Sequence, residues 1–452
     1  MLRAGFLALA KGLLVLLAPQ VLAAPATLLE LYQHFHAKPE LSFQEVETSE
    51  RVAQELEVLG FTVTRGVGGN TIRRQLAESG SILNDKVGGH GVVAVFNNGP
   101  GPVVMLRTDT DALPVREQTG LPYASKVMGQ ELTGLEVAVM HACGHDLHMT
   151  AVIGAARELM AQRSRWSGTL IVIAQPAEER GSGARIMLED GLFERFPRPH
   201  YILALHASPA LPVGSVAWTS GWMMANVDSV DIRIHGIGAH GAYPHTGKDP
   251  IVLAASIIMD LQTLVSREIS ALEPAVVTVG SIHSGAKHNI ISDRADLQLT
   301  VRSYSDQVRH KLLTGIERIA VNQARALGFP EDRMPEVVVK EPGTPALWND
   351  PALVARNVEV LKRTLGEERV SEGEQVMGGE DFALYGRQEP LIPSHMFRLG
   401  TVAPERYEAH LRGELQLPSM HSPFYAPVPK GSIETGVTAF TALVLDLLAP
   451  TE

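Results

Sequence analysis

The chain has 452 residues, of which 45% are hydrophobic and 20% are charged, and its formal net charge is −11. This length suggests two or three domains. The acidic balance, together with the lack of a basic run in the sequence, argues against nucleic acid as a partner. A single cysteine excludes an intramolecular disulfide.

The first 23 residues have the pattern of a secretory signal. Arg3 supplies a positive start, and an apolar run from Leu7 to Leu17 follows it. The run is too short to span a membrane, and Pro19 interrupts it. We therefore expect residues 1–23 to be removed and the protein to be exported, to the periplasm or outside the cell. The alternative is a tether made by an uncleaved N-terminal segment. No later stretch suggests a stable membrane span.

The part that follows this leader is expected to mix helices and strands. Two helices are expected within residues 25–62, the second of them ending at Gly60. Residues 64–90 are rich in glycine, which indicates an irregular segment. Strands are expected at 92–96 and 103–106, with a glycine-rich turn between them.

Further along the chain, helices and strands alternate. We expect a helix over 150–160, a continuously apolar strand over 169–174 and another strand over 201–205. This alternation is typical of an α/β fold with a mostly parallel central sheet flanked by helices. Near the C-terminus, helices are expected over 351–365 and 433–448.

The pattern changes between residues 223 and 335. The elements expected there are strands at 227–234, 276–282 and 296–302 and helices at 251–266 and 306–327. This order predicts a smaller α+β, ferredoxin-like domain. It would be inserted into a catalytic domain made of residues 24–222 and 336–452.

The stretch from Met140 to His148 holds three of the 17 histidines and the only cysteine. A thiolate, imidazoles and a carboxylate packed so closely favour a transition metal such as zinc over magnesium or calcium. A lone buried cysteine would be the simpler interpretation, but further acids and histidines follow downstream. Metal ligation would also protect an unpaired thiol in an oxidising compartment.

Candidate ligands and catalytic groups recur where the predicted strands end. Asp109 and Asp111 follow one strand, where they would bind metal or orient a histidine, the alternative being a capped surface turn. Glu178 and Glu179 follow another strand, where one would bind metal while the other acts as general base. The alternative for this pair is a favourable helix start. His206 ends a third strand.

Two further motifs are less specific. Residues 236–241 contain the spacing GxGxxG, which also occurs in dinucleotide-binding folds. His240 and Pro244 interrupt the place where the phosphate-binding helix would begin, so a nicotinamide oxidoreductase is disfavoured. His421 lies in a loop before the final helix. A lone histidine there is more often structural, but it is the best late candidate for a ligand.

Several short motifs occur in order along the chain: Pro39–Phe43, Asp109–Pro114, Met140–His148, Gln175–Glu179, Gly238–Pro250, Gly378–Phe382 and His421–Pro423. Together they resemble the aminoacylase and carboxypeptidase family of two-metal peptidases, peptidase family M20. Within it the chain is similar to the amidohydrolase subfamily, which includes hippurate hydrolases, N-acyl-amino-acid amidohydrolases and indole-acetyl-amino-acid hydrolases. The resemblance covers nearly all of the chain after the leader.

The resemblance implies a binuclear metal-dependent amidohydrolase. Such an enzyme would cleave the amide bond of N-acyl amino acids, or of related small amide conjugates, with a metal-activated water. The implied ligands are Cys143, His145, Glu179, His206 and His421, with Cys143 bridging. They would hold two divalent ions per subunit, drawn from Zn, Mn, Co or Ni. Glu178 would be the base that activates the water and later protonates the leaving amine.

The resemblance also implies roles around these ligands. The inserted domain would be a lid, which mediates dimer contacts in related enzymes, so a homodimer or a higher oligomer is expected. His240 would stabilise the developing oxyanion, Asn289 would contact the substrate, and Arg302 is a candidate for its carboxylate. The residues implied to support the ligands from behind are Asp109, Asp111, Asp146 and His148.

The chain departs from the family pattern in two places. Residues 68–88 are longer than the usual connection, and Tyr425 stands where the family commonly has aspartate, so support for His421 is expected to differ. A dipeptidase or carboxypeptidase on the same fold is the nearest alternative activity. A non-catalytic protein that binds small amides is the alternative from another class. The presence of Glu178 and of every candidate ligand argues against it.

Overall fold

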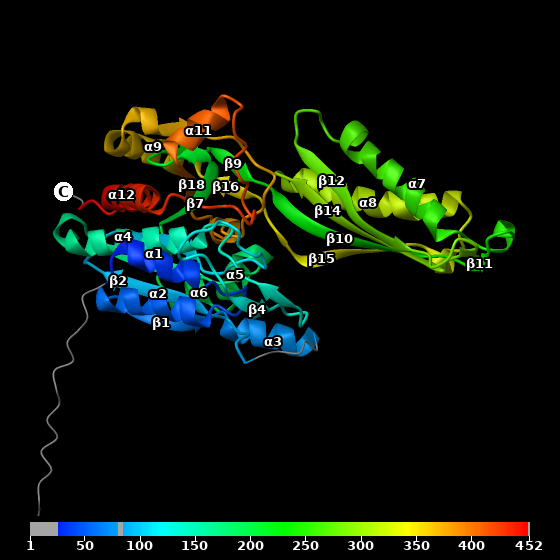
Figure 1. Ribbon diagram of the computed structural model, residues 1–452, viewed down its shortest axis with the longest axis horizontal. Coiled ribbons are helices and arrows are strands. Elements are labelled where there is room, and N and C mark those ends of the chain that lie inside the picture. Colours follow the sequence, from blue (N-terminus) through cyan, green and yellow to red (C-terminus); the bar gives the residue numbers. More distant parts are fainter. Residues whose placement is uncertain (1–25, 80–84, 451–452) are drawn as a thin grey trace, which may run out of the picture.

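The computed structural model describes residues 26–79 and 85–450. The expected leader lies outside the described residues, so export stays a prediction. The described chain forms a larger and a smaller unit that lie side by side along the long axis of the molecule (Figure 1). The larger unit contains both the N-terminal and the C-terminal parts, and the smaller unit is the segment between them.

The larger unit is built on an eight-stranded sheet with the strand order β1-β2-β6-β3-β7-β18-β8-β17. The strands are β1 Thr62–Val67, β2 Gly91–Asn97, β3 Val103–Asp109, β6 Thr169–Gln175, β7 Tyr201–Pro212, β8 Val216–Trp218, β17 Val370–Glu372 and β18 Ser394–Val402. The central pairs β6–β3, β3–β7 and β7–β18 are parallel, whereas β1–β2 and β2–β6 are antiparallel. The predicted fold class, α/β with a mostly parallel sheet, is confirmed.

Helices cover both faces of this sheet. They are α1 Leu28–Ala37, α2 Val46–Val58, α3 Gly69–Ser79, α4 His145–Ala161, α5 Gly183–Glu189, α6 Leu192–Arg195, α9 Pro351–Leu365, α10 Ala383–Gly386, α11 Pro404–Leu411 and α12 Pro429–Leu447. Leu170 and Val172 of β6 pack in a core with α1, α2, α4, α9 and α12. Ile171 and Ile173 point the other way and pack with α5, α6 and α10. This double burial explains why β6 is apolar along its whole length.

Two strand predictions differ from the structure in detail. The strands around the turn at 97–101 do not pair with each other, because β2 and β3 lie on opposite sides of β6. His206 does not end its strand, because β7 continues to Pro212. The continuation pairs with β18, where Val402 is the partner of Pro212. Local sequence does not reveal either pairing.

The segment at 64–90 is not irregular throughout, as the sequence had indicated. Its first residues complete β1, which pairs with β2, and α3 follows directly. The glycines on either side of α3 led to the expectation of an irregular segment, so neither β1 nor α3 was predicted from composition.

The smaller unit has a four-stranded antiparallel sheet with the order β12-β14-β10-β15. Its elements are β10 Asn226–His235, α7 Pro250–Thr263, β12 Ala275–Ser284, β14 Arg294–Ser303, α8 Asp306–Ala326 and β15 Glu336–Thr344. The two helices and the sheet enclose a separate apolar core. The sequence placed the end of this insertion at residue 335, but β15 extends its sheet to Thr344.

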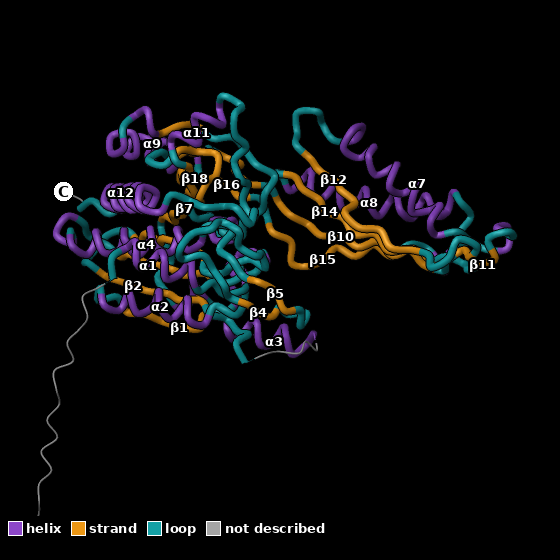
Figure 2. The backbone as a smooth tube through the Cα atoms, viewed as in Figure 1, coloured by secondary structure: helices purple, strands orange, loops and turns teal. Residues whose placement is uncertain are grey.

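Three small strand pairs mark the ends of the two units (Figure 2). β4 Met128–Gln130 pairs with β5 Glu136–Ala138 on the larger unit. β9 Gly221–Met224 pairs with β16 Leu347–Asn349 where the chain passes between the units. β11 Ala239–His240 pairs with β13 Ile290–Ile291 at the end of the smaller unit that is farthest from the larger one.

Among the described residues, one helix qualifies as a membrane span by length and composition alone. It runs from Pro250 to Glu268, with a mean hydropathy of 1.3, whereas the sequence had suggested no such stretch. One third of it (33%) is buried inside the unit. Leu253, Ile257 and Leu261 form the inner face and pack in the core of the smaller unit.

Candidate metal centre

The residues predicted as metal ligands come from separate parts of the larger unit and converge near the carboxyl ends of β3 and β6. Cys143 and His145 flank the start of α4, and Glu179 lies in a short turn of 3₁₀-helix after β6. His206 lies in β7, and His421 lies in the loop before α12.

Distances between their side chains show how closely they meet. Cys143 Sγ is 3.6 Å from His206 Nε2, and His145 Nε2 is 3.8 Å from Glu179 Oε1. The other carboxylate oxygen of Glu179 is 3.5 Å from His421 Nε2. Glu179 therefore lies between two histidines, so that each of its oxygens faces a different one.

A left-handed turn brings the first two ligands together. Gly144 has a φ of 86°, a conformation that glycine adopts without steric cost. A Cβ atom at this position would also lie 2.9 Å from the Cβ of Ala207, next to the ligand His206. The glycine thus allows Cys143 and His145 to approach β7 closely.

Buried polar atoms in this cluster fit a bound cation. His145 Nε2 and Glu179 Oε1 are buried and make no hydrogen bond to any described residue. Leaving such an atom unsatisfied costs about 1–3 kcal/mol. The Nδ1 atoms of His145 and His206 lie 2.7 Å and 2.8 Å from the carbonyl oxygens of Asp111 and Ala207. Those contacts leave the lone pair on Nε2 of each ring free to bind a metal.

Burial disfavours the charged forms of three of the candidate ligands. It lowers the pKa of His206 to about 3, so this imidazole is neutral at physiological pH. It raises the pKa of Glu179 to about 7 and the pKa of the Cys143 thiol well above its usual range. A dry site disfavours both anions unless a cation compensates their charge. A thiolate, imidazoles and a carboxylate suit transition metals.

Asp111 positions several of these groups at once. Its carboxylate accepts hydrogen bonds from the backbone amides of Glu178 and Glu179, both at 3.1 Å. The hydroxyl of Ser42 donates to the same carboxylate at 2.6 Å. Because the Asp111 carbonyl also binds His145, one residue links a ligand to the turn that carries both glutamates.

Asp109 and His148 are buried beside the candidate ligands and contact each other. His148 Nδ1 is 2.7 Å from Asp109 Oδ1, and His148 Nε2 accepts a hydrogen bond from the Ala207 amide at 2.8 Å. Both ring nitrogens are therefore engaged, and His148 is not placed to bind metal. It holds the backbone next to His206 instead.

Asp146 differs from its predicted role as support for the ligands. Its carboxylate accepts a hydrogen bond from the Leu147 amide and lies 2.7 Å from His36 Nδ1. The other His36 nitrogen is 3.1 Å from Glu117 Oε1. Burial opposes protonation of His36, but the two carboxylates outweigh it and raise its pKa to about 9. Asp146 therefore ties the start of α4 to α1.

Glu178 lies between the ligands and a group of buried acids. One of its oxygens is 3.9 Å from His145 Nε2, and its other acidic neighbours are Glu380 and Asp381. Burial, and then the charge of Glu380, raise the pKa of Glu178 well above its usual range. A carboxylate with a raised pKa beside the ligands suits proton transfer near neutral pH.

Arg107 organises this group of acids, and sequence reasoning assigned it no role. The guanidinium is only 1% exposed and donates hydrogen bonds to Asp109 Oδ2 at 2.6 Å and Glu380 Oε1 at 2.8 Å. It also donates to Asp381 Oδ1 at 3.2 Å and to Gln175 Oε1 at 3.0 Å. Two features of the sequence could have indicated this role: Arg107 lies two residues before Asp109, and the adjacent acids Glu380 and Asp381 follow two glycines.

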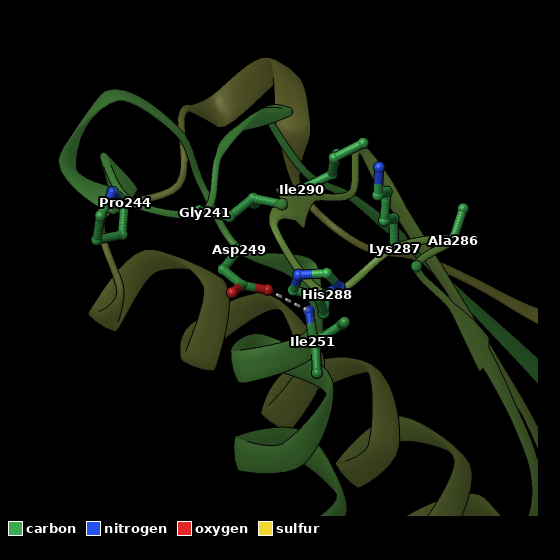
Figure 3. Close-up of a pocket in the computed structure, with 10 residues that line it drawn as sticks. Gly241, Pro244, Asp249, Ile251, Ala286, Lys287, His288 and Ile290 are labelled. Carbon is green, nitrogen blue, oxygen red and sulfur yellow. Dashed lines mark hydrogen bonds between the residues drawn. The ribbon is translucent and has the colours of Figure 1, made fainter.

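The predicted lid residues lie apart from the ligand cluster. His240, on β11, is exposed at the far end of the smaller unit (Figure 1). Asn289 is its neighbour there, because the Gly241 amide donates to the Asn289 carbonyl at 2.8 Å. An open pocket of about 520 Å³ adjoins them, and Asp249 and His288 are among the residues around it (Figure 3).

Arg302 lies nearer to the larger unit, on β14. Its guanidinium donates to the carbonyl of Met377, in the larger unit, at 3.2 Å and to Thr300 Oγ1 at 2.9 Å. Tyr425 lies beside the ligands instead of the aspartate common in the family. Its buried hydroxyl is 3.2 Å from Thr401 Oγ1.

Comparison with known proteins decides the family. Residues 105–444 match the sequence profile of Peptidase family M20/M25/M40. The chain belongs to this family. N-acetylcysteine deacetylase of Bacillus subtilis is 36% identical over 381 residues, which cover 84% of this chain and 90% of that protein. Thermostable carboxypeptidase 1 of Saccharolobus solfataricus is 35% identical over 376 residues, covering 83% and 86%.

A solved structure of a dinuclear metal-binding M20 peptidase from Bacillus subtilis shares the fold. Its TM-score is 0.70 at 30% identity, and the alignment covers 93% of this chain and 97% of that one. The predicted family and reaction class are thereby confirmed: this M20 enzyme is a metal-dependent amidohydrolase or peptidase. Together with the clustered ligands, the comparison supports two divalent ions.

The buried His36 predicts a pH-dependent stability. Its pKa rises from 6.5 to about 9 on folding, so the protonated ring stabilises the folded state fully below pH 6.5. This contribution, roughly 3 kcal/mol at most, is lost as the pH rises through 9. We expect His36→Gln to be much less stable than wild type at pH 6 and to approach it at pH 10, measured by urea unfolding with a chelator present. The exposed His310→Gln serves as control, and a difference that did not shrink with pH would contradict the assignment.

Proposed function

We propose that this M20 enzyme hydrolyses the amide bond of N-acyl amino acids or of related small amide conjugates. The observation that carries the proposal is the pair of adjacent glutamates. Both approach His145 Nε2, Glu179 at 3.8 Å and Glu178 at 3.9 Å, and of the two it is Glu179 that also faces His421, at 3.5 Å. The likeness to N-acetylcysteine deacetylase supports this substrate class.

The chain's own residues divide the reaction between them. When bound, two divalent ions polarise the scissile carbonyl and lower the pKa of the attacking water. Glu178 accepts a proton from that water as it adds to the carbonyl carbon. The same carboxyl then protonates the nitrogen as the carbon–nitrogen bond breaks, which releases an amine and a carboxylic acid. Asp111 holds Glu178 in place through the backbone amide.

The ligands Cys143, His145, Glu179, His206 and His421 would hold the two ions. Glu179 has an oxygen facing each of two histidines, and the Cys143 sulfur lies near His206. This mixed donor set suits transition metals, and Zn, Mn, Co and Ni are the candidates.

A substrate panel tests the reaction and the metal together. The protein would be treated with a chelator, reloaded with Zn, Mn, Co or Ni, and assayed for amine release from hippurate, N-acetyl and long-chain N-acyl amino acids, and dipeptides. We expect metal-restored cleavage of one N-acyl class. Cleavage of dipeptides alone would favour the peptidase alternative, which the likeness to the carboxypeptidase also supports. No cleavage by metal-loaded protein would favour a binding protein.

Replacement of the proposed base separates catalysis from metal binding. We expect Glu178→Gln to lower kcat by roughly 10²–10⁴-fold, because the amide cannot accept the proton. The metal content should stay at the wild-type level, since the ligands are intact. Kinetics and elemental analysis of the same preparation check both points. The exposed Glu405→Gln is the matched control, and full activity of Glu178→Gln would exclude this base.

We also propose that the enzyme is a homodimer through the smaller unit, which acts as a lid. His240, on β11, and its neighbour Asn289 lie at its far end, so we propose that a second copy brings these two residues to the ligands. Helix α7 presents Ile251, Val252 and Met259 to solvent, with Met259 70% exposed. An apolar helix face of this kind is typical of a protein contact. The strand β12 beside it is an unpaired edge of the sheet among the described strands.

Mixing two inactive variants tests this arrangement. If the partner's lid supplies His240, a dimer of one His240→Ala chain and one Glu178→Gln chain contains one intact site. An equal mixture, after subunit exchange, should regain about one quarter of wild-type activity. His240→Ala mixed with Asn289→Ala is the control, because every lid then carries a defect and no recovery is expected. Recovery absent from the first mixture would mean that each lid closes over its own site.

A further inference from the structure

The two ends of the extra segment at 68–88 meet at one point. A Cβ atom on Gly89 would lie 2.2 Å from both the Gly68 carbonyl carbon and the Gly69 nitrogen, so the two backbones touch. The sequence Val-Gly-Gly occurs at both ends, at 67–69 and 87–89. Helix α3 lies between them, at the rim of the larger unit that faces the lid (Figure 1).

Helix α3 contributes to a small apolar cluster beneath the catalytic turn. Ile72 is 4% exposed and packs in a cluster with Phe43, Ala177 and Ile186. Val87, at the other end of the segment, is partly buried against the same cluster. A hydrogen bond of 2.9 Å from the Gly88 amide to the Phe43 carbonyl ties the segment to it.

Two residues of this cluster have strained backbones. Among the described residues other than glycine, positive φ values occur only at Phe43 (66°), Ala177 (49°) and His421 (63°). A residue in this region costs on the order of 1–3 kcal/mol and keeps its conformation only where the surroundings determine it. His421 is a candidate ligand, and the other two share the cluster that α3 completes.

Both strained residues are coupled to the catalytic groups. Ala177 immediately precedes Glu178, and its amide donates to Glu45 Oε1 at 2.8 Å. Phe43 immediately follows Ser42, whose hydroxyl binds the Asp111 carboxylate. A change in either backbone conformation would therefore move the turn that presents the two glutamates.

We propose that helix α3 is a positioning element for Glu178 and Glu179. Ile72 completes the cluster that holds Ala177 and Phe43 in their left-handed conformations, and this packing sets the direction of the glutamate turn. The effect on turnover rests on the proposed function. The effect on metal affinity does not, because Glu179 is carried by the same turn.

Truncation of Ile72 in the otherwise complete chain tests the proposal. We expect Ile72→Ala to lower kcat about 10-fold at saturating metal with KM nearly unchanged, because the base is misdirected while the substrate site is intact. Zinc affinity, measured by competition with a chromogenic chelator, should fall about 10-fold as well. Ile72→Val should retain most of the wild-type kcat and zinc affinity, since valine keeps most of the packing.

A second substitution separates positioning from general stability. Glycine adopts the conformation of Ala177 without a Cβ penalty, so Ala177→Gly added to Ile72→Ala should recover kcat and zinc affinity even though it restores no packing. Val354→Ala removes an equally buried side chain on α9 and is the matched control for lost stability, with thermal unfolding measured for every variant. It should leave zinc affinity unchanged.

The outcomes distinguish the two proposals. Equal losses of zinc affinity in Ile72→Ala and Val354→Ala, or no recovery with Ala177→Gly, would overturn the positioning role. A rise in KM alone would also overturn it, since α3 would then shape the substrate site. If the wild type cleaves no amide, the proposed function fails, and zinc affinity still decides the role of α3.

Discussion

Burial of many carboxylates in one place is the constraint on which the site depends. Asp109, Asp111, Glu380 and Asp381 are all at most 1% exposed, and Glu178 and Glu179 lie beside them. Uncompensated charges at this depth would be too costly to keep. Arg107, the backbone amides of the glutamate turn and the histidines offset part of the charge. Cations at the ligand atoms would complete the balance, which would couple metal binding to folding of this region.

The candidate ligands and Glu178 lie in the larger unit, whereas the lid residues lie far from them in the smaller unit. The ligands and the base sit on elements of the larger unit whose strands are buried on both faces. The packing of the larger unit therefore keeps Glu178 and Glu179 in place beside the histidines. The lid has its own core and carries His240 and Asn289 at its far end. Its exposed helix α7 and open strand edge are where association of two chains would complete the site.

Strain in the backbone is concentrated around the same site. In the described part of the chain, the residues with positive φ, glycine aside, are a candidate ligand and two members of the cluster beneath the glutamates. Such conformations persist because packing and hydrogen bonds over-determine them. The extra helix α3 belongs to that packing, which gives a segment outside the usual family pattern a place in catalysis rather than at the surface alone.

The order of short motifs along the sequence indicated the family and, through that resemblance, the full set of candidate ligands. The alternation of helices and strands indicated the fold class. Acids and histidines at strand ends, near a lone cysteine, already favoured a metal site. Helices with regular apolar periods, such as 351–365, were also predictable. Other features depend on contacts between residues that are distant in the chain, and these appear only in the folded structure. It extended β7 past His206, turned Asp146 to His36, and gathered Arg107 with Glu380 and Asp381. These contacts join residues far apart in the chain, and no local pattern encodes which of them will meet.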